Sequence, residues 1–121
     1  MAYGDMASNF KKLLVYQRAR ALADELRSLV VQWPEFDRDS VGMQLMCSAD
    51  SVAANIAEAG GRWTLKDKRN FLYIARGSLL ETEHWLDCAL SRGLITTSMD
   101  GQITEIARLL NGLINNPAPA S

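Results

Sequence analysis

The sequence predicts an all-α protein, an antiparallel up-down-up-down bundle of four helices. Four stretches of the chain place apolar residues three and four positions apart, which is the spacing of one face of an α-helix. The connections between these stretches are short, and no run alternates apolar and polar residues as a half-buried strand would. Four amphipathic helices with short connections pack most simply as such a bundle, in which each helix buries its apolar stripe against two neighbours.

The chain has 121 residues and suits a single domain with one core. We expect a flexible lead-in over residues 1–9, the bundle domain over residues 10–116 and a flexible tail over residues 117–121. No apolar run approaches the roughly 18 residues of a membrane-spanning helix, which excludes that class. The first ten residues lack the basic and apolar segments of a secretory signal, so the cytoplasm is the expected compartment.

The first helix is expected over residues 10–33. It should end before Pro34, because proline disfavours helical geometry in the residue that precedes it. Residues 34–40 are polar and are expected to form a turn-rich connector, with Ser40 as the N-cap of the next helix. The apolar stripe of the first helix consists of Val15, Ala19, Leu22, Leu26, Leu29 and Trp33.

The second helix is expected to end at the Gly60-Gly61 pair, since glycines are common just beyond helix ends. Thr64, followed three residues later by Asp67, resembles a capping box that opens a third helix. That helix should run through residue 92, with Gly93 as its left-handed cap. The stripe of the second helix consists of Val41, Leu45, Ser48, Val52, Ile56 and Ala59.

The fourth helix can be capped by Ser98 or Asp100 and should end before Pro117. Its apolar side consists of Ile103, Ile106, Ala107, Leu110, Leu113 and Ile114.

The third helix has more apolar surface than a bundle core needs. Its apolar residues spread over more than the ~100° of a core-facing stripe, which indicates a second contact surface. A second copy of the chain is the simplest partner for this surface. The alternative is that the connector over residues 34–40 covers it. These residues are Phe71, Leu72, Ile74, Ala75, Leu79, Leu80, Trp85, Leu86, Ala89 and Leu90.

The charge balance does not indicate a nucleic-acid binder as a whole. Thirteen basic residues stand against fourteen acidic ones, for a formal charge of -1, so phosphate binding would have to depend on local patches. Two stretches are locally basic, one in the first helix and one over residues 62–69. Solvated helix faces often look the same. The candidate nucleic-acid contacts are Lys11, Lys12, Arg18, Lys66, Lys68 and Arg69.

Catalytic and metal chemistry have little support. Glu81 and His84 form the E-x-x-H spacing of di-metal bundle sites, but the chain has one histidine and such a site needs two. Cys88 follows His84 by four residues and could lie beside it, although packing is the favoured role for this thiol. Cys47 and Cys88 are both expected as reduced core thiols. The Gly60-Gly61 pair lacks the pattern of a nucleotide loop, and no cofactor is expected.

Polar residues also fall on or beside the buried stripes. Asn55 lies next to Ile56, and Glu81 lies near a packed face of the third helix. An amide and a carboxylate that meet across two helices would form a mutually satisfied network that specifies register. The expected members are Asn55, Glu58, Arg62, Ser78 and Glu81.

Several motifs together resemble the four-helix bundle proteins encoded in intervening sequences of bacterial 23S ribosomal RNA genes, also named S23 ribosomal proteins. The similarity covers roughly residues 10–115. It rests on Leu14-Val15-Tyr16-Gln17 with Ala19, Gln44-Leu45, Ser51, Asn55-Ile56-Ala57-Glu58, Gly61-Arg62, Phe71-Leu72-Tyr73-Ile74-Ala75-Arg76-Gly77-Ser78-Leu79, Glu81-Thr82-Glu83 and Gly93-Leu94-Ile95.

The resemblance implies an antiparallel four-helix bundle that assembles into a homo-oligomeric ring, with a pentamer as the expected form, and no enzymatic activity. A related branch, the accessory proteins of diversity-generating retroelements, implies binding of nucleic acid and a reverse transcriptase. This chain differs where the family usually carries arginines after Gln44, since Met46 and Cys47 stand there and Asp50 follows. The leading interpretation is therefore a non-enzymatic oligomer that binds an unidentified partner, and the alternative is a nucleic-acid or ribonucleoprotein accessory factor.

Overall fold

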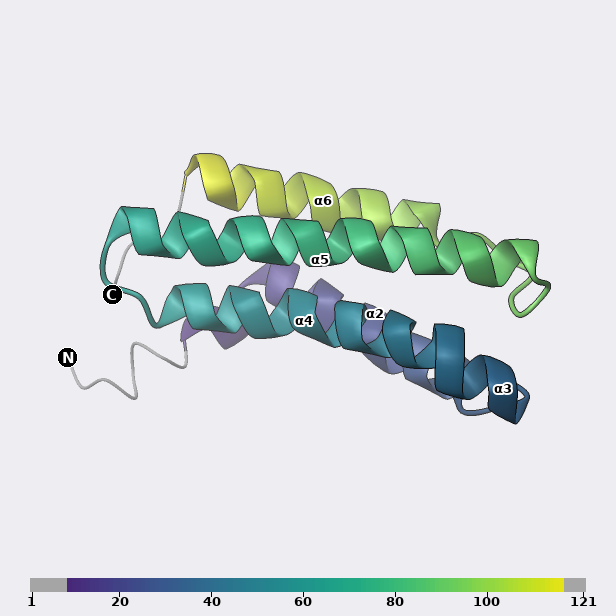
Figure 1. The fold of residues 1–121 in the computed structure, drawn as a ribbon. Coiled ribbons are helices and arrows are strands. Elements are labelled where there is room, and N and C mark those ends of the chain that lie inside the picture. The colour runs from purple at the N-terminus through teal and green to yellow at the C-terminus, as the bar shows by residue number, and fades with distance from the viewer. Residues whose placement is uncertain (1–8, 117–121) are drawn as a thin grey trace.

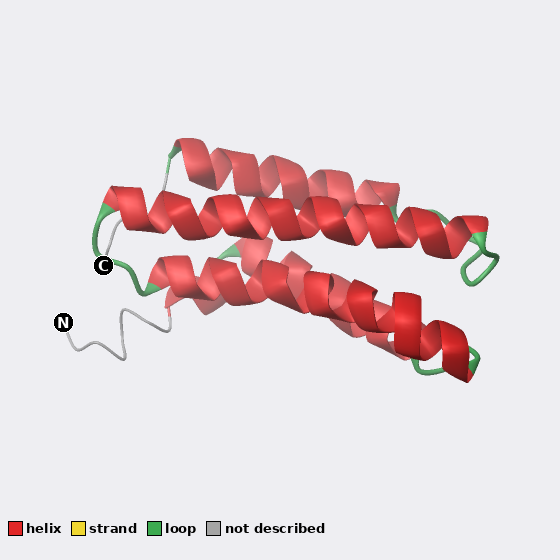
Figure 2. Cartoon of the chain, viewed as in Figure 1, coloured by secondary structure: helices red, strands yellow, loops and turns green. Residues whose placement is uncertain are grey.

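A computed structural model describes residues 9–116, which fold into four long helices packed side by side (Figure 1). The expected lead-in lies outside the described residues except for Asn9, and the expected tail lies outside them entirely. The described residues contain helices, turns and loops and no strand, which confirms the all-helical prediction (Figure 2). The long helices are α2 (Leu14–Val30), α4 (Met43–Gly60), α5 (Leu65–Ser91) and α6 (Asp100–Asn115).

The N-terminal end differs from the single helix that the sequence predicts. Residues Asn9–Lys12 form a short 3-10 helix, η1, and α2 begins only at Leu14, because the backbone of Leu13 is extended. Five of the six predicted stripe residues of this segment are buried, and Leu29 is half-buried. The periodicity therefore identifies the buried face correctly although the boundary is displaced.

The predicted connector over residues 34–40 is wrong. Helical geometry starts directly after Pro34, in α3 (Glu35–Asp37), and continues through a π-helical turn, η2 (Arg38–Gly42), into α4. Ser40 is not an N-cap, because its hydroxyl donates to the carbonyl oxygen of Phe36 within the continuous helix. The two carboxylates in the first turn of α3 favour a helix start there, since they lie near the positive end of the helix dipole.

The ends of α5 agree with prediction. The Thr64 hydroxyl accepts the N–H of Asp67 at 3.1 Å, as an N-cap should. At the other end Gly93 has φ +74°, and the N–H groups of Gly93 and Leu94 bond the carbonyls of Leu90 and Ala89. This pair of bonds is the Schellman motif, which closes the last turn of a helix. With 27 residues, α5 is about 40 Å long and is the longest helix.

The start of α6 differs from both predicted caps, because Met99 occupies the N-cap position and makes no side-chain capping hydrogen bond. The Ser98 hydroxyl accepts the N–H of Asp100, the first residue of the helix, at 3.1 Å. Ile103, Ile106, Leu110 and Ile114 are buried, whereas Ala107 and Leu113 are half-buried.

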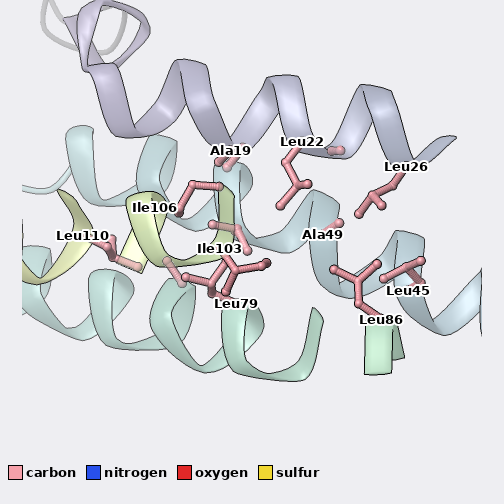
Figure 3. Packing of buried hydrophobic residues seen from close by; sticks show 14 of the residues in the cluster. Ala19, Leu22, Leu26, Leu45, Ala49, Leu79, Leu86, Ile103, Ile106 and Leu110 are labelled. Carbon is pink, nitrogen blue, oxygen red and sulfur yellow. The ribbon is translucent and has the colours of Figure 1, made fainter. Parts of the chain in front are cut away.

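One hydrophobic core lies between the four long helices. Buried side chains from all four meet there, among them Leu22 of α2, Leu45 of α4, Leu79 of α5 and Ile106 of α6 (Figure 3). The second-helix stripe is buried in full, as predicted. The predicted core thiol at position 47 is wrong, because Cys47 is exposed on α4. No helix among residues 9–116 is both long and apolar enough to cross a membrane.

Candidate functional site

A seam of polar side chains joins α4 to α5 inside the bundle. The hydroxyl oxygens of Ser48 and Thr82 lie 3.0 Å apart, and those of Ser51 and Ser78 lie 2.9 Å apart. Thr82 is completely buried and also lies 2.8 Å from the carbonyl oxygen of Ser78. We call Ser48, Ser51, Ser78 and Thr82 the hydroxyl seam. Its hydroxyls satisfy one another, which is the condition for burying polar groups at low cost.

Asn55 belongs to the edge of this seam. Its amide nitrogen donates to the carbonyl oxygen of Ser51 at 2.8 Å and lies 2.9 Å from the Ser51 hydroxyl. Asn55 thus reaches Ser78 only through Ser51. The contact with Glu81 expected from the sequence does not form among the described residues, because Glu81 is exposed on α5.

Glu58 and Arg62 form a separate polar pair at the end of α4. The Arg62 guanidinium makes an ion pair with the Glu58 carboxylate one helical turn away. The same guanidinium lies over the Phe71 ring, 4.4 Å from its centroid, which is the geometry of a cation–π contact. Of the five residues expected in one network, the structure places Asn55 and Ser78 in one group, Glu58 and Arg62 in a second, and Glu81 in neither.

Lys68, a candidate nucleic-acid contact, is buried instead of exposed. Its side chain is 7% exposed, and its ammonium group donates to the carbonyl oxygen of Ala59 in the last turn of α4 at 3.3 Å. A cation at that position stabilises the negative end of the α4 dipole. Burial disfavours the charged form and lowers the pKa of Lys68 from its ordinary value of 10.5. This amine is not available to a phosphate.

Arg69 performs the same task for α6. Its Nε donates to the carbonyl oxygen of Ile114 in the last turn of α6 at 3.0 Å. Arg18 is also engaged, because its guanidinium lies 3.0 Å from the Glu105 carboxylate and links α2 to α6. The predicted basic surface is therefore wrong for Lys68, which is buried. It is reduced at Arg69 and Arg18, whose guanidinium groups bond a helix carbonyl and a carboxylate.

Three of the candidate cations, Lys11, Lys12 and Lys66, remain exposed. They lie in η1 and in the first turn of α5, both at the end of the bundle where α4 turns into α5 (Figure 1). A surface groove of about 730 Å³ opens at the same end. The groove is lined by Phe10, Ala57, Glu58, Gly61, Arg62, Trp63, Thr64 and Asp67.

The candidate catalytic residues form a pair and not a complete site. The Cys88 sulfur lies 3.7 Å from Nε2 of His84, as the spacing of four predicts, and the His84 ring packs edge-on against Trp85. Glu81 lies on the same helix but makes no hydrogen bond to either residue in the described part of the chain. Within residues 9–116 no three His, Cys, Asp or Glu side chains are grouped closely enough to hold a metal ion.

Exposed apolar side chains lie along the outer surface of α5. Tyr73 and Leu80 are seven residues apart and so lie on one side of the helix, and Ile74 directly follows Tyr73. Leu80 is 62% exposed. We call Tyr73, Ile74 and Leu80 the α5 apolar patch. The prediction of apolar surface on this helix beyond the core is confirmed, and residues 34–40 pack as a helix in line with α4 and leave the patch exposed.

Ser48, Ser51 and Thr82 belong to the hydroxyl seam but are absent from the network expected from the sequence. Spacing is the signal that could have found them. Ser48, Ser51 and Asn55 step by three and four along α4, and Ser78 and Thr82 step by four along α5. Each of the two helices therefore has a polar stripe of helical period beside its apolar stripe, which indicates that the hydroxyls face each other across the α4 and α5 interface. The roles of Lys68 and Arg69 have no such signal, because the carbonyls they bond belong to other helices.

Comparison with known proteins agrees with this architecture. The family model of the 23S rRNA-intervening sequence protein matches residues 11–114. A solved structure of a protein of unknown function from the S23 ribosomal protein family of Bacteroides thetaiotaomicron VPI-5482 is similar, with a TM-score of 0.77 and 28% sequence identity. The alignment covers 85% of this chain and 96% of that one. No curated protein matches the sequence. Since the family model spans most of the chain, this protein belongs to the 23S rRNA-intervening sequence protein family.

Proposed function

We propose that the protein is a non-enzymatic, antiparallel four-helix bundle that assembles with copies of itself and acts by binding a partner. The observation that carries this proposal is the α5 apolar patch. Three large apolar side chains exposed on one helix, away from the core, are typical of a contact surface. The antiparallel arrangement is supported by the seam, in which residue numbers rise along α4 as they fall along α5.

A ring is the assembly that the family resemblance implies, with five copies as the expected number. A heterologous contact, in which the α5 apolar patch meets a different surface of the next copy, closes into a ring when the rotation between copies divides a full turn. The hydroxyl seam contributes to the assembly indirectly. It sets the register of α4 against α5, and with it the shape of the α5 surface that a second copy would meet.

Sedimentation of the full chain tests the assembly. We expect a particle several times the 13.4 kDa mass of one chain at micromolar concentration. Leu80→Glu should shift it to the monomer, because a buried unpaired carboxylate is costly. Val31→Glu is the matched control, since Val31 is an exposed apolar residue just after α2. A parent protein that sediments at 13.4 kDa would overturn the proposal.

A second candidate function is nucleic-acid binding, and one observation favours it. Lys11, Lys12 and Lys66 are exposed and lie at one end of the bundle. Three exposed ammonium groups can contact phosphates, and such contacts weaken steeply with salt. Two results would count against this function: a nucleic-acid probe that does not bind, or one whose affinity is the same at 50 and 200 mM salt.

A further inference from the structure

The groove at the turn between α4 and α5 carries an exposed indole. Trp63 is 67% exposed although it is a large aromatic residue, and it lines the groove together with Phe10 of η1 and Asp67 of α5. An aromatic side chain left in water on a groove wall is available to stack on a ligand. The groove therefore offers a flat apolar face at an open site.

A second flat group lies next to Trp63 in the sequence and lines the same groove. The guanidinium of Arg62 is held in place by the ion pair with Glu58 and by the Phe71 ring. Both contacts fix the side chain before any ligand arrives, so little conformational entropy is lost when a planar group stacks on it. Arginine planes and aromatic rings are the two surfaces on which proteins stack unpaired bases.

The charges at this end favour an anionic ligand. Lys11 and Lys12 are the two residues after Phe10, and Lys66 precedes Asp67, so all three lysines lie within two positions of a residue that lines the groove. Two carboxylates also line the groove. That of Glu58 is paired with Arg62, and that of Asp67 remains. Among residues 9–116, the four cations Lys11, Lys12, Arg62 and Lys66 stand against these two carboxylates and leave the groove positive, on a protein whose formal charge is -1.

We propose that this groove binds single-stranded nucleic acid, with a base stacked on Trp63 and the neighbouring phosphates held by Lys11, Lys12 and Lys66. A duplex does not fit this chemistry, because its base faces are already covered by neighbouring pairs. The inference rests on the nucleic-acid function proposed above and adds the contact that lysines alone do not provide. Trp63 supplies that contact, although charge patterning does not reveal this residue.

Binding of fluorescein-labelled oligonucleotides to the full chain tests the groove. Twelve-nucleotide oligo-rU and oligo-dT should both bind, a duplex of the same length should bind less tightly, and the ratio of the first two tells whether RNA or DNA is preferred. With three phosphate contacts on a single strand, affinity should fall about twentyfold between 50 and 200 mM salt. Trp63→Ala should weaken binding by about tenfold or more, since stacking is lost.

Three variants control this experiment. Trp63→Phe should retain most of the affinity, because a phenyl ring also stacks. Phe36→Ala should leave binding unchanged, since Phe36 is 82% exposed but lies in α3 at the opposite end of the bundle. Lys66→Ala should weaken binding and flatten its salt dependence by one contact. The exposed position of Trp63 predicts that all Trp63 variants melt at the temperature of the parent.

The possible results distinguish binding in the groove from binding by the lysines alone. Salt-dependent binding that is equal in Trp63→Ala and the parent would overturn the groove and leave the nucleic-acid function intact. Absence of binding to every oligonucleotide would remove both. A Trp63→Ala protein that sediments as smaller particles with unchanged affinity would show that the groove seats a second copy of the chain, which also overturns the inference.

Discussion

The hydroxyl groups of Thr82 and Ser48 lie 3.0 Å apart across the α4 and α5 interface, where Thr82 is completely buried and Ser48 nearly so. Each hydroxyl also lies near a carbonyl oxygen in the turn before it, Ser78 for Thr82 and Leu45 for Ser48. The pair joins two helices whose contact is the most extensive in the bundle.

Thr82→Val should destabilise the protein by about 1 kcal/mol, because it keeps the volume and removes a buried hydrogen bond. Urea unfolding followed by circular dichroism measures this change. Thr104→Val is the control, since Thr104 is exposed on α6. In a cycle with Ser48→Ala, the double variant should lose less than the sum of the single losses, and strict additivity would show that the two hydroxyls do not interact.

Lys68→Met should be no less stable than the parent at pH 7. Methionine keeps most of the apolar contacts and removes a buried charge, whereas the bond to Ala59 offsets only part of the desolvation cost. Burial lowers the pKa of Lys68 in the folded state. Between that pKa and 10.5 the unfolded chain binds more protons, so the parent gains stability as pH rises through this window.

The measurement for Lys68 is the difference in unfolding free energy between Lys68→Met and the parent from pH 7 to 10.5. Any stability advantage of Lys68→Met over the parent should shrink or reverse as pH rises. Lys66→Met controls for the general effect of alkaline pH, because Lys66 is exposed. Parallel pH profiles for the parent and Lys68→Met would contradict the effect of burial.

Gly42→Ala should destabilise the bundle by about 1–3 kcal/mol, the usual cost of overpacking. A Cβ at this position, the last residue of η2, would lie 2.7 Å from Cγ1 of Val30, so α2 and η2 would have to separate. Val30→Ala should restore part of the loss by removing that methyl group. Gly112→Ala is the control in α6, where an added Cβ meets nothing within 4 Å and should stabilise the helix by about 0.5–1 kcal/mol. Thermal melts would contradict this account if both variants changed alike.

Gly93→Ala should cost about 1 kcal/mol, because an L side chain at φ +74° is strained. The loss should appear as lower stability with no change in the m-value, since the cap lies in a tight turn and not in the core. Gly93→Asn should cost less, because asparagine tolerates the left-handed conformation. Equal losses in the two variants would indicate that backbone strain is not the cause.

Much of the fold follows from patterns within single helices. The buried faces of α4 and α6, the Thr64 cap and the Gly93 stop depend on residues within a few positions of one another, and each is readable from spacing and residue type. The start of the second helix is not, because a polar segment after Pro34 suits a turn as well as an acidic first helical turn. The expected polar network was wrong at Glu81 for a similar reason. Glu81 lies close to core-facing positions in the sequence, yet its side chain is exposed.

The sequence by itself determined an all-helical bundle, its buried stripes and an apolar excess on α5, because these depend on the period of one helix. Only the tertiary structure decided how the basic residues are used. Lys68 and Arg69 bond carbonyls in the last turns of α4 and α6, whereas Lys66, two and three positions away, remains in water. The difference depends on which helix ends lie beside α5, and that is a property of packing between segments distant in the chain.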